Sequence, residues 1–292
     1  MSLQENINKY WDYLEKKYPS PKYVGKVKYM EFKDLKRAVD NKNENYIKKL
    51  IKNMYLKREA YIVRNSGSKK LKKTIIDLAN HYKKTRKTNF FKMRDGTPNF
   101  HRVIDKNITK KYNLFAIRHS FYFYNWNIRS KLEKNLKDGV YKHWRYVKYL
   151  AGNSKNQFER NIPSDNQIDR LQIIRYPAGG GELRSHVDPR KNQRIVSGLI
   201  MSKIGEDFIK GGFYFKSSRT RKKNIEKRLE LGDAVMFYGS IVHGVGKVDP
   251  HEKLVWKSNK GRWFIGMFVN DSDHVHNRVT PKDVSTRMEA KN

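Results

Sequence analysis

The sequence predicts an α+β protein with a mainly β core that follows a helical N-terminal region. Apolar residues recur at helical spacing in roughly the first hundred residues. After about residue 115, short strand-like runs alternate with Gly, Pro, Asn or charged turns. Aromatic residues make up 13% of the chain, which favours a folded core over disorder. Many short strands in series are typical of a β-sandwich or a β-barrel.

Three N-terminal helices are predicted from the spacing of apolar side chains. They cover about residues 7–14, 46–55 and 71–82. A short β-type run at residues 60–64 lies between the second and the third helix. We expect the lysines of these helices to face solvent. Residues 1–114 are therefore predicted to be a mainly helical region that packs on the core.

The β-rich core is predicted over residues 115–273 and begins with the aromatic run 121–124. A helix over residues 130–150 is predicted next from its apolar spacing. Residues 274–292 are predicted to form a polar C-terminal tail. The remaining strands of the core are predicted at residues 172–176, 195–202, 212–215, 234–238 and 263–269.

The net charge of +35 arises because 64 Lys and Arg residues face only 29 Asp and Glu residues. Such a field attracts nucleic acid, anionic membrane surfaces or acidic small molecules. A lysine-rich composition can also reflect codon usage in an A- and T-rich genome. Charge alone leaves a functional partner and compositional drift open.

The chain has no cysteine, so disulfides, thiolate metal sites and cysteine nucleophiles are excluded. Any metal must be bound by histidine, carboxylate or backbone oxygen. The N-terminus lacks an apolar stretch of signal-peptide length, and the longest apolar runs are too short to span a bilayer. We therefore expect a soluble, cytoplasmic protein.

Three residues of the β-rich half form a predicted metal site. His186 and Asp188 are two positions apart in a predicted strand, so their side chains should lie on the same face. His243 is the predicted third ligand. Two histidines and one carboxylate leave three positions open on an octahedral ion, which suits iron(II) enzymes that bind a cosubstrate and oxygen together. A closed four-ligand zinc site is a poor match. The sequence thus predicts that His186, Asp188 and His243 hold a catalytic iron.

The motifs around these ligands follow a recognisable order along the chain. Tyr176 and a glycine run precede the His-x-Asp pair, and a Gly-Gly-aromatic strand follows it. A Gly-Asp turn leads into an apolar strand before His243, and Gly261-Arg262 enters the last strand. In this order of motifs, residues 170–270 resemble the iron(II)/2-oxoglutarate-dependent dioxygenase superfamily, close to its prolyl-hydroxylase-like branch.

The resemblance implies a double-stranded β-helix, or jelly roll, as the core fold. It also implies Fe(2+), 2-oxoglutarate and O2 as cofactor and cosubstrates, with substrate hydroxylation and release of succinate and CO2. Arg262 is implied as the residue that binds the far carboxylate of 2-oxoglutarate. Many relatives have Ser or Thr two residues later, where this chain has Phe264. We expect Tyr176 to supply the missing hydrogen bond. Asp188 favours hydroxylation or another oxygenase outcome over halogenation, because related halogenases have a small residue at this position.

The sequence leaves three hypotheses for the substrate. The first is a small polar, anionic metabolite; Arg184, two residues before His186, should share its face and bind it, and the alternative for Arg184 is a surface position on a twisted or bulged segment. The second is a nucleic acid or protein bound by the basic surface, including the lysines of residues 69–73, although nucleic-acid demethylases of the superfamily carry an Arg where this chain has Phe268. The third is a binding module without catalysis. We favour the first hypothesis. The sequence does not indicate the oligomeric state.

Overall fold

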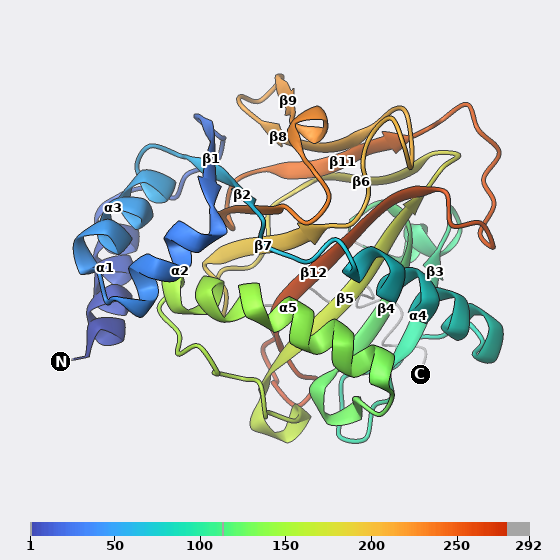
Figure 1. The fold of residues 1–292 in the computed structure, drawn as a ribbon, viewed down its shortest axis with the longest axis horizontal. Coiled ribbons are helices and arrows are strands. Elements are labelled where there is room, and N and C mark those ends of the chain that lie inside the picture. The colour runs from blue at the N-terminus through green and yellow to red at the C-terminus, as the bar shows by residue number, and fades with distance from the viewer. Residues whose placement is uncertain (1, 113, 279–292) are drawn as a thin grey trace.

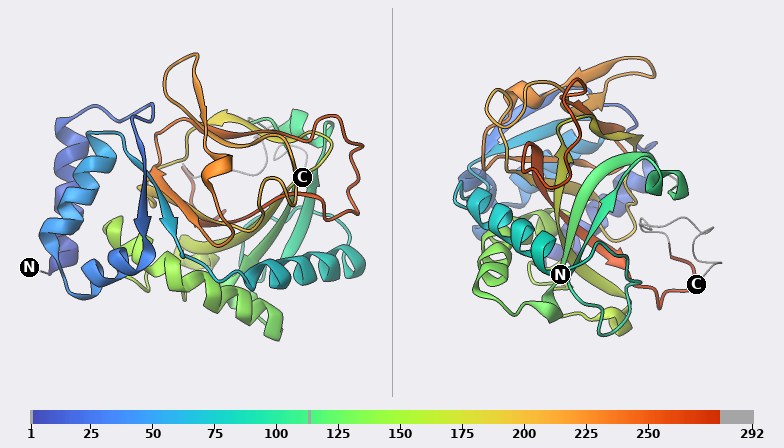
Figure 2. Two further views of the ribbon diagram at one scale, coloured as in Figure 1. Left: turned by 45° about the horizontal axis from the view of Figure 1, so that its top comes forward. Right: turned by 90° about the vertical axis from the view of Figure 1, so that its right-hand side faces the viewer.

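Among the described residues, twelve strands form one curled sheet whose two halves face each other (Figures 1 and 2). An internal cavity lies between the two halves. The computed structural model describes residues 2–112 and 114–278. The larger half has the strand order β1-β2-β10-β7-β12-β5-β4, with β3 paired to β4. At β4 the sheet continues into the smaller half, β6-β11-β8-β9. Apart from the parallel β1–β2 pair, these pairings are antiparallel. The predicted jelly roll is confirmed.

The helices and strands of the described residues have the following bounds. The α-helices are α1 Leu3–Lys17, α2 Phe32–Asp40, α3 Glu44–Tyr55, α4 Leu71–Thr85 and α5 Lys131–Leu150. The strands are β1 Val27–Glu31, β2 Ala60–Arg64, β3 Phe100–Ile104, β4 Ala116–Tyr124, β5 Gln167–Pro177, β6 Gly181–His186, β7 Ile195–Ile200, β8 Gly212–Lys216, β9 Lys222–Asn224, β10 Ala234–Tyr238, β11 His243–Val248 and β12 Gly261–Asp271.

Local sequence explains why the long helices start where they do. Ser130 caps α5 by accepting a hydrogen bond from the Glu133 amide, and the Glu133 carboxylate accepts one from the Ser130 amide. This capping box satisfies backbone donors that the first turn would leave unpaired. The α1 helix begins with the same arrangement between Ser2 and Glu5. Helices α4 and α5 lie against the outer face of the larger half-sheet (Figure 1).

Alternation along β5 separates the outer core from the interior of the jelly roll. Leu171 and Ile173 point outward into the large apolar cluster that includes the buried faces of the helices. Ile174 and Tyr176 belong to a different cluster, between the two halves of the sheet. Because successive side chains of a strand point to opposite faces, one strand supplies both the structural core and the wall of the internal space.

The predicted helices and strands of the core are present, but the N-terminal region holds more than helices. Strand β2 pairs with β10 and β1 pairs with β2, so this region extends the larger half-sheet. The predicted division after residue 114 falls between β3 and β4, which pair with each other. Of the predicted tail, residues 279–292 lie outside the described residues.

No helix among the described residues is both long enough and apolar enough to cross a membrane.

Candidate metal centre

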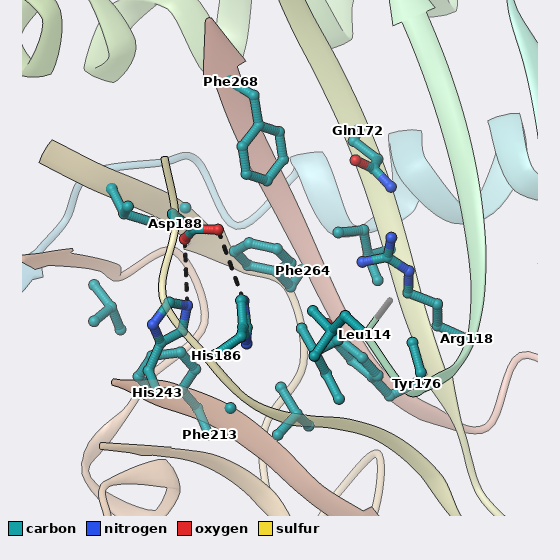
Figure 3. A pocket seen from close by; sticks show the side chains of 18 of the residues that line it. Leu114, Arg118, Gln172, Tyr176, His186, Asp188, Phe213, His243, Phe264 and Phe268 are labelled. Atoms are coloured by element: carbon teal, nitrogen blue, oxygen red, sulfur yellow. Dashed lines mark ion pairs between the residues drawn. The ribbon is translucent and has the colours of Figure 1, made fainter. Parts of the chain in front are cut away.

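Strand register brings the three predicted ligands together at the mouth of the internal space. His186 ends β6 and His243 begins β11, and these two residues are direct cross-strand partners. Asp188 follows two residues after β6. Figure 3 shows Asp188 facing both imidazoles. One ligand atom from each of the three residues lies within 4.8 Å of the others.

The spacing of the ligand atoms fits a single ion. The Asp188 carboxylate lies 3.7 Å from Nε2 of His186 and 3.4 Å from Nε2 of His243. Nitrogen and oxygen ligands about 2.1 Å from a metal, at right angles to each other, are about 3 Å apart. The observed distances are only slightly longer. Three ligands on one side of an ion leave the opposite side open to other molecules.

Backbone carbonyls orient both imidazoles for this role. Nδ1 of His186 is 3.0 Å from the carbonyl oxygen of Arg184, and Nδ1 of His243 is 3.0 Å from that of Ile241. A carbonyl can only accept, so each Nδ1 must carry the proton. The lone pair of each ring is then on Nε2, the atom that faces Asp188. Such carbonyl contacts fix the tautomer of metal-binding histidines.

The surroundings of His186 and Asp188 favour the protonation states in which these side chains can bind a metal. Burial, followed by the nearby His243, lowers the pKa of His186 to about 4, so the imidazole is neutral at neutral pH. Burial alone would raise the pKa of Asp188, but the adjacent imidazoles of His243 and His186 lower it overall. A neutral imidazole and an ionised carboxylate are the forms that bind metal.

Arg184 does not share a face with His186, contrary to the sequence prediction. Leu183 pairs with Val245 while His186 pairs with His243, so β6 has one residue more than β11 over this stretch. This β-bulge shifts the alternation of side chains. Arg184 is exposed and lies over the ring of Phe115, at 4.1 Å, outside the lining of the internal cavity.

Arg262 lines the internal cavity and is held by a carboxylate that the sequence analysis missed. Its Nε lies 3.0 and 2.9 Å from the two carboxylate oxygens of Glu226, and each side chain of this pair is 1% exposed. Nη2 of Arg262 is buried and has no hydrogen-bond partner among the described residues. Glu226 packs against Gly212, where an added Cβ would lie 2.4 Å from Cγ of Glu226. The Gly211-Gly212 pair, where β8 begins, is therefore the sequence feature that could have indicated this packing of Glu226.

Tyr176 is the direct cross-strand partner of Arg262 and also lines the cavity. Burial raises the pKa of its phenol, although the positive charges of Arg118 and Arg262 oppose this effect. Tyr176 therefore stays protonated at neutral pH and can donate a hydrogen bond. Arg118 of β4 lies beside it (Figure 3). The sequence analysis did not single out Arg118.

A cavity of about 670 Å³ connects the three ligands with Arg262 and Tyr176. Its wall is mostly apolar. Arg170 and Gln172 lie on the same wall as Tyr176, because every second side chain of β5 points into the cavity. This alternation could have been predicted from the sequence. The lining includes Leu114, Arg118, Ile174, Val196, Ile200, Phe213, Phe237, Phe264 and Phe268.

The residues of this centre fit an iron ion and an acidic cosubstrate. Two imidazoles with free Nε2 lone pairs and one ionised carboxylate provide a donor set for iron(II). The unpartnered Nη2 of Arg262 offers a charged donor to a carboxylate in the same cavity.

Comparison with known proteins identifies the fold. No family model matches the chain, and no curated protein matches its sequence significantly. Among solved structures, a full-length Neurospora crassa protein in complex with alpha-KG and 5-formyluracil has a TM-score of 0.50 at 12% identity, over 84% of each chain. A Pseudomonas putida prolyl-4-hydroxylase has a TM-score of 0.45 at 9% identity, over 72% of this chain and 91% of its own. A 2OG-Fe(II) oxygenase family protein from Caulobacter crescentus has a TM-score of 0.38 at 12% identity, over 72% of this chain and 76% of its own. The likeness to the Neurospora crassa structure shows a shared fold.

Proposed function

We propose that this protein is an iron(II)/2-oxoglutarate-dependent dioxygenase that hydroxylates an unactivated C–H bond of a small anionic metabolite. The observation that carries the proposal is the grouping of His186, Asp188 and His243 beside a cavity that also contains Arg262. The predicted order of motifs and the geometry of the side chains agree on the same residues. The fold is one in which this chemistry is established for other proteins.

Each residue has a defined part in the proposed reaction. His186, Asp188 and His243 would hold the iron and leave one side of it open. Arg262 would bind the far carboxylate of 2-oxoglutarate through Nη2, while Glu226 holds Nε. Tyr176 would donate a second hydrogen bond from its protonated phenol. When bound, iron and 2-oxoglutarate supply the oxidising power, with O2 consumed and succinate and CO2 released.

The charge of the cavity wall supports an anionic substrate. Arg118, Arg170 and Arg278 line the cavity in addition to Arg262; of these, Arg262 is paired with Glu226 and Arg278 with Asp273. Asp188 is the only acidic residue among the described lining residues, and it is a predicted metal ligand. A low-dielectric cavity lined by positive charge attracts anions.

The proposal is tested by succinate release from 2-oxoglutarate in the presence of iron(II) and pooled anionic metabolites. We expect release above the uncoupled background in the wild type. His243→Ala should reduce it to background while circular dichroism shows an intact fold. Arg184→Ala is the matched control, because this exposed residue lies outside the cavity. Normal succinate release by His243→Ala would refute the assignment.

A further inference from the structure

The cavity wall next to Ile174 on β5 carries two polar side chains that belong to neither the candidate metal centre nor the proposed cosubstrate site. Arg170 and Gln172 of β5 point into the cavity although they are only 4% and 1% exposed. The cross-strand partner of Gln172 on β12 is Gly266, and the rings of Phe268 and Phe264 occupy the space that a side chain there would fill. Phe268 is the partner of Arg170. Figure 3 shows Gln172 and Phe268 on neighbouring strands of the same wall.

The amide of Gln172 is oriented and has one unused donor. Its Oε1 accepts a hydrogen bond from Nη2 of Arg170 at 3.3 Å, which distinguishes the oxygen from the nitrogen of the amide. Nε2 is buried and has no hydrogen-bond partner among the described residues. Buried polar groups nearly always have a partner, and leaving one unsatisfied destabilises the protein. An acceptor oxygen from a bound molecule would satisfy this donor.

The surroundings of this amide combine positive charge with aromatic surface. The guanidinium of Arg170 lies 5.5 Å from the centre of the Phe268 ring. Phe264, on the same strand as Phe268, and Leu114 line the cavity as well. A ligand that fits this wall needs an oxyanion at one end and an apolar body beside it.

We propose that this wall is the substrate subsite, and that the substrate is an amphipathic organic anion. Its oxyanion, a carboxylate, sulfonate or phosphate, accepts a hydrogen bond from Nε2 of Gln172, beside the positively charged guanidinium of Arg170. Its apolar body packs against Phe264 and Phe268. A molecule bound in this way would lie in the same cavity that His186, Asp188 and His243 line. The identification of the bound molecule as substrate rests on the proposed function; the binding preference itself does not.

Two fluorescent dyes that differ by one group test the binding preference. 8-Anilino-1-naphthalenesulfonate is an aromatic anion, and 1-anilinonaphthalene is the same body without the sulfonate. Both are titrated into the full-length protein with Zn(II) in place of iron and with saturating 2-oxoglutarate, so that the cosubstrate site is filled. We expect the anionic dye to bind one site about tenfold or more tightly than the neutral dye, because it gains hydrogen bonds to charged and polar donors.

Gln172→Glu should remove this preference. The added negative charge should weaken binding of the sulfonate dye by about tenfold or more, while binding of the neutral dye stays within about twofold. Arg184→Gln lowers the net charge by the same amount at an exposed position and should leave both affinities unchanged. If Gln172→Glu does not fold by circular dichroism, Gln172→Leu removes the same donor without adding charge and should also weaken the sulfonate dye.

Equal affinities of the two dyes in the wild type would overturn the proposal. So would a folded Gln172→Glu or Gln172→Leu variant that binds the sulfonate dye as well as Arg184→Gln does. Dye binding is independent of turnover, so a failure here is distinguishable from a failure of the proposed function, which succinate release reports.

Discussion

At the scale of single residues, the metal centre depends on a few groups whose protons and charges are fixed by their neighbours. Nδ1 of His186 and Nδ1 of His243 contact backbone carbonyls, so Nε2 of each ring is left as the nitrogen that could bind a metal. The Glu226–Arg262 pair similarly fixes the direction of the guanidinium. Side chains whose orientation is set in advance lose less entropy when they bind a ligand.

The buried ion pair leads to a prediction about Arg262. Arg262→Met should raise the apparent KM for 2-oxoglutarate by about tenfold or more, because a charge-assisted hydrogen bond is lost. It should also lower the free energy of unfolding by about 3–5 kcal/mol, because Glu226 is left as a buried, unpaired charge. KM is measured by succinate release, and stability by urea unfolding.

The loss of stability can be separated from the rise in the KM for 2-oxoglutarate. In the double variant Arg262→Met/Glu226→Gln, the uncharged amide no longer needs a partner of opposite charge, so most of the lost stability should return. The high KM should remain. If the double variant also recovers a normal KM, another basic residue binds 2-oxoglutarate.

At the scale of the elements, strand register assembles the site. The pairing of Tyr176 with Arg262 and of His186 with His243 brings together residues that are far apart in the sequence. Motif order allowed the three predicted metal ligands, Arg262 and Tyr176 to be singled out from the sequence, and all five residues line one cavity.

Other features could not be read from the sequence, for physical reasons. The extra residue in β6 shifts the alternation between Leu183 and His186, and local sequence gives no sign of it, so Arg184 was expected on the wrong face. Glu226 is distant in sequence from Arg262, so their pairing depends on tertiary structure. The strand β3 (Phe100–Ile104) follows a polar stretch and has no strong alternation, and it forms because β4 offers a partner.

The close approach of β7 to β12 gives a prediction at this scale. Gly198 pairs with Gly266, and a Cβ at Gly198 would lie 1.9 Å from the Phe264 ring. Gly198→Ala should therefore lower the free energy of unfolding by about 1–3 kcal/mol through overpacking. Phe264→Leu in the same chain should relieve part of this loss, giving a measurable coupling in a double-mutant cycle followed by urea unfolding. Additive effects of the two substitutions would show that the strands can separate to make room.

At the scale of the whole molecule, the charge of +35 is not concentrated in one free cluster of lysines at residues 69–73. Lys72 forms an ion pair with Asp207, and Lys73 forms one with Asp77, while Lys69 and Lys70 are exposed. A nucleic-acid partner remains an alternative prediction that salt-dependent binding would test.

The buried side chain of His143 leads to a prediction of how the free energy of unfolding depends on pH. His143 of α5 is fully buried, its Nε2 lies 2.8 Å from Oγ of Ser197, and burial lowers its pKa to about 3. In the unfolded chain a histidine has a pKa near 6.5. Between these values the unfolded state binds the extra proton, so stability is full above about pH 6.5 and falls as the pH is lowered.

His143→Gln should remove this contribution while keeping a group that can hydrogen-bond to Ser197. Between about pH 6.5 and 4, the free energy of unfolding should fall less steeply in the variant, by about 1.4 kcal/mol per pH unit. Urea unfolding at a series of pH values measures both slopes. Parallel slopes would mean that His143 takes up a proton in the folded state at ordinary pH.

The central claim is that the three-residue centre holds iron(II) together with 2-oxoglutarate, and it can be tested without knowing the substrate. Chelation of iron(II) by a 2-oxo acid produces a visible charge-transfer absorption band, which neither component gives alone. We expect this band when both are added to the wild-type protein without oxygen, saturating with one iron per chain, and no band with His243→Ala. Absence of the band in the wild type, or an equal band in folded His243→Ala, would contradict the account.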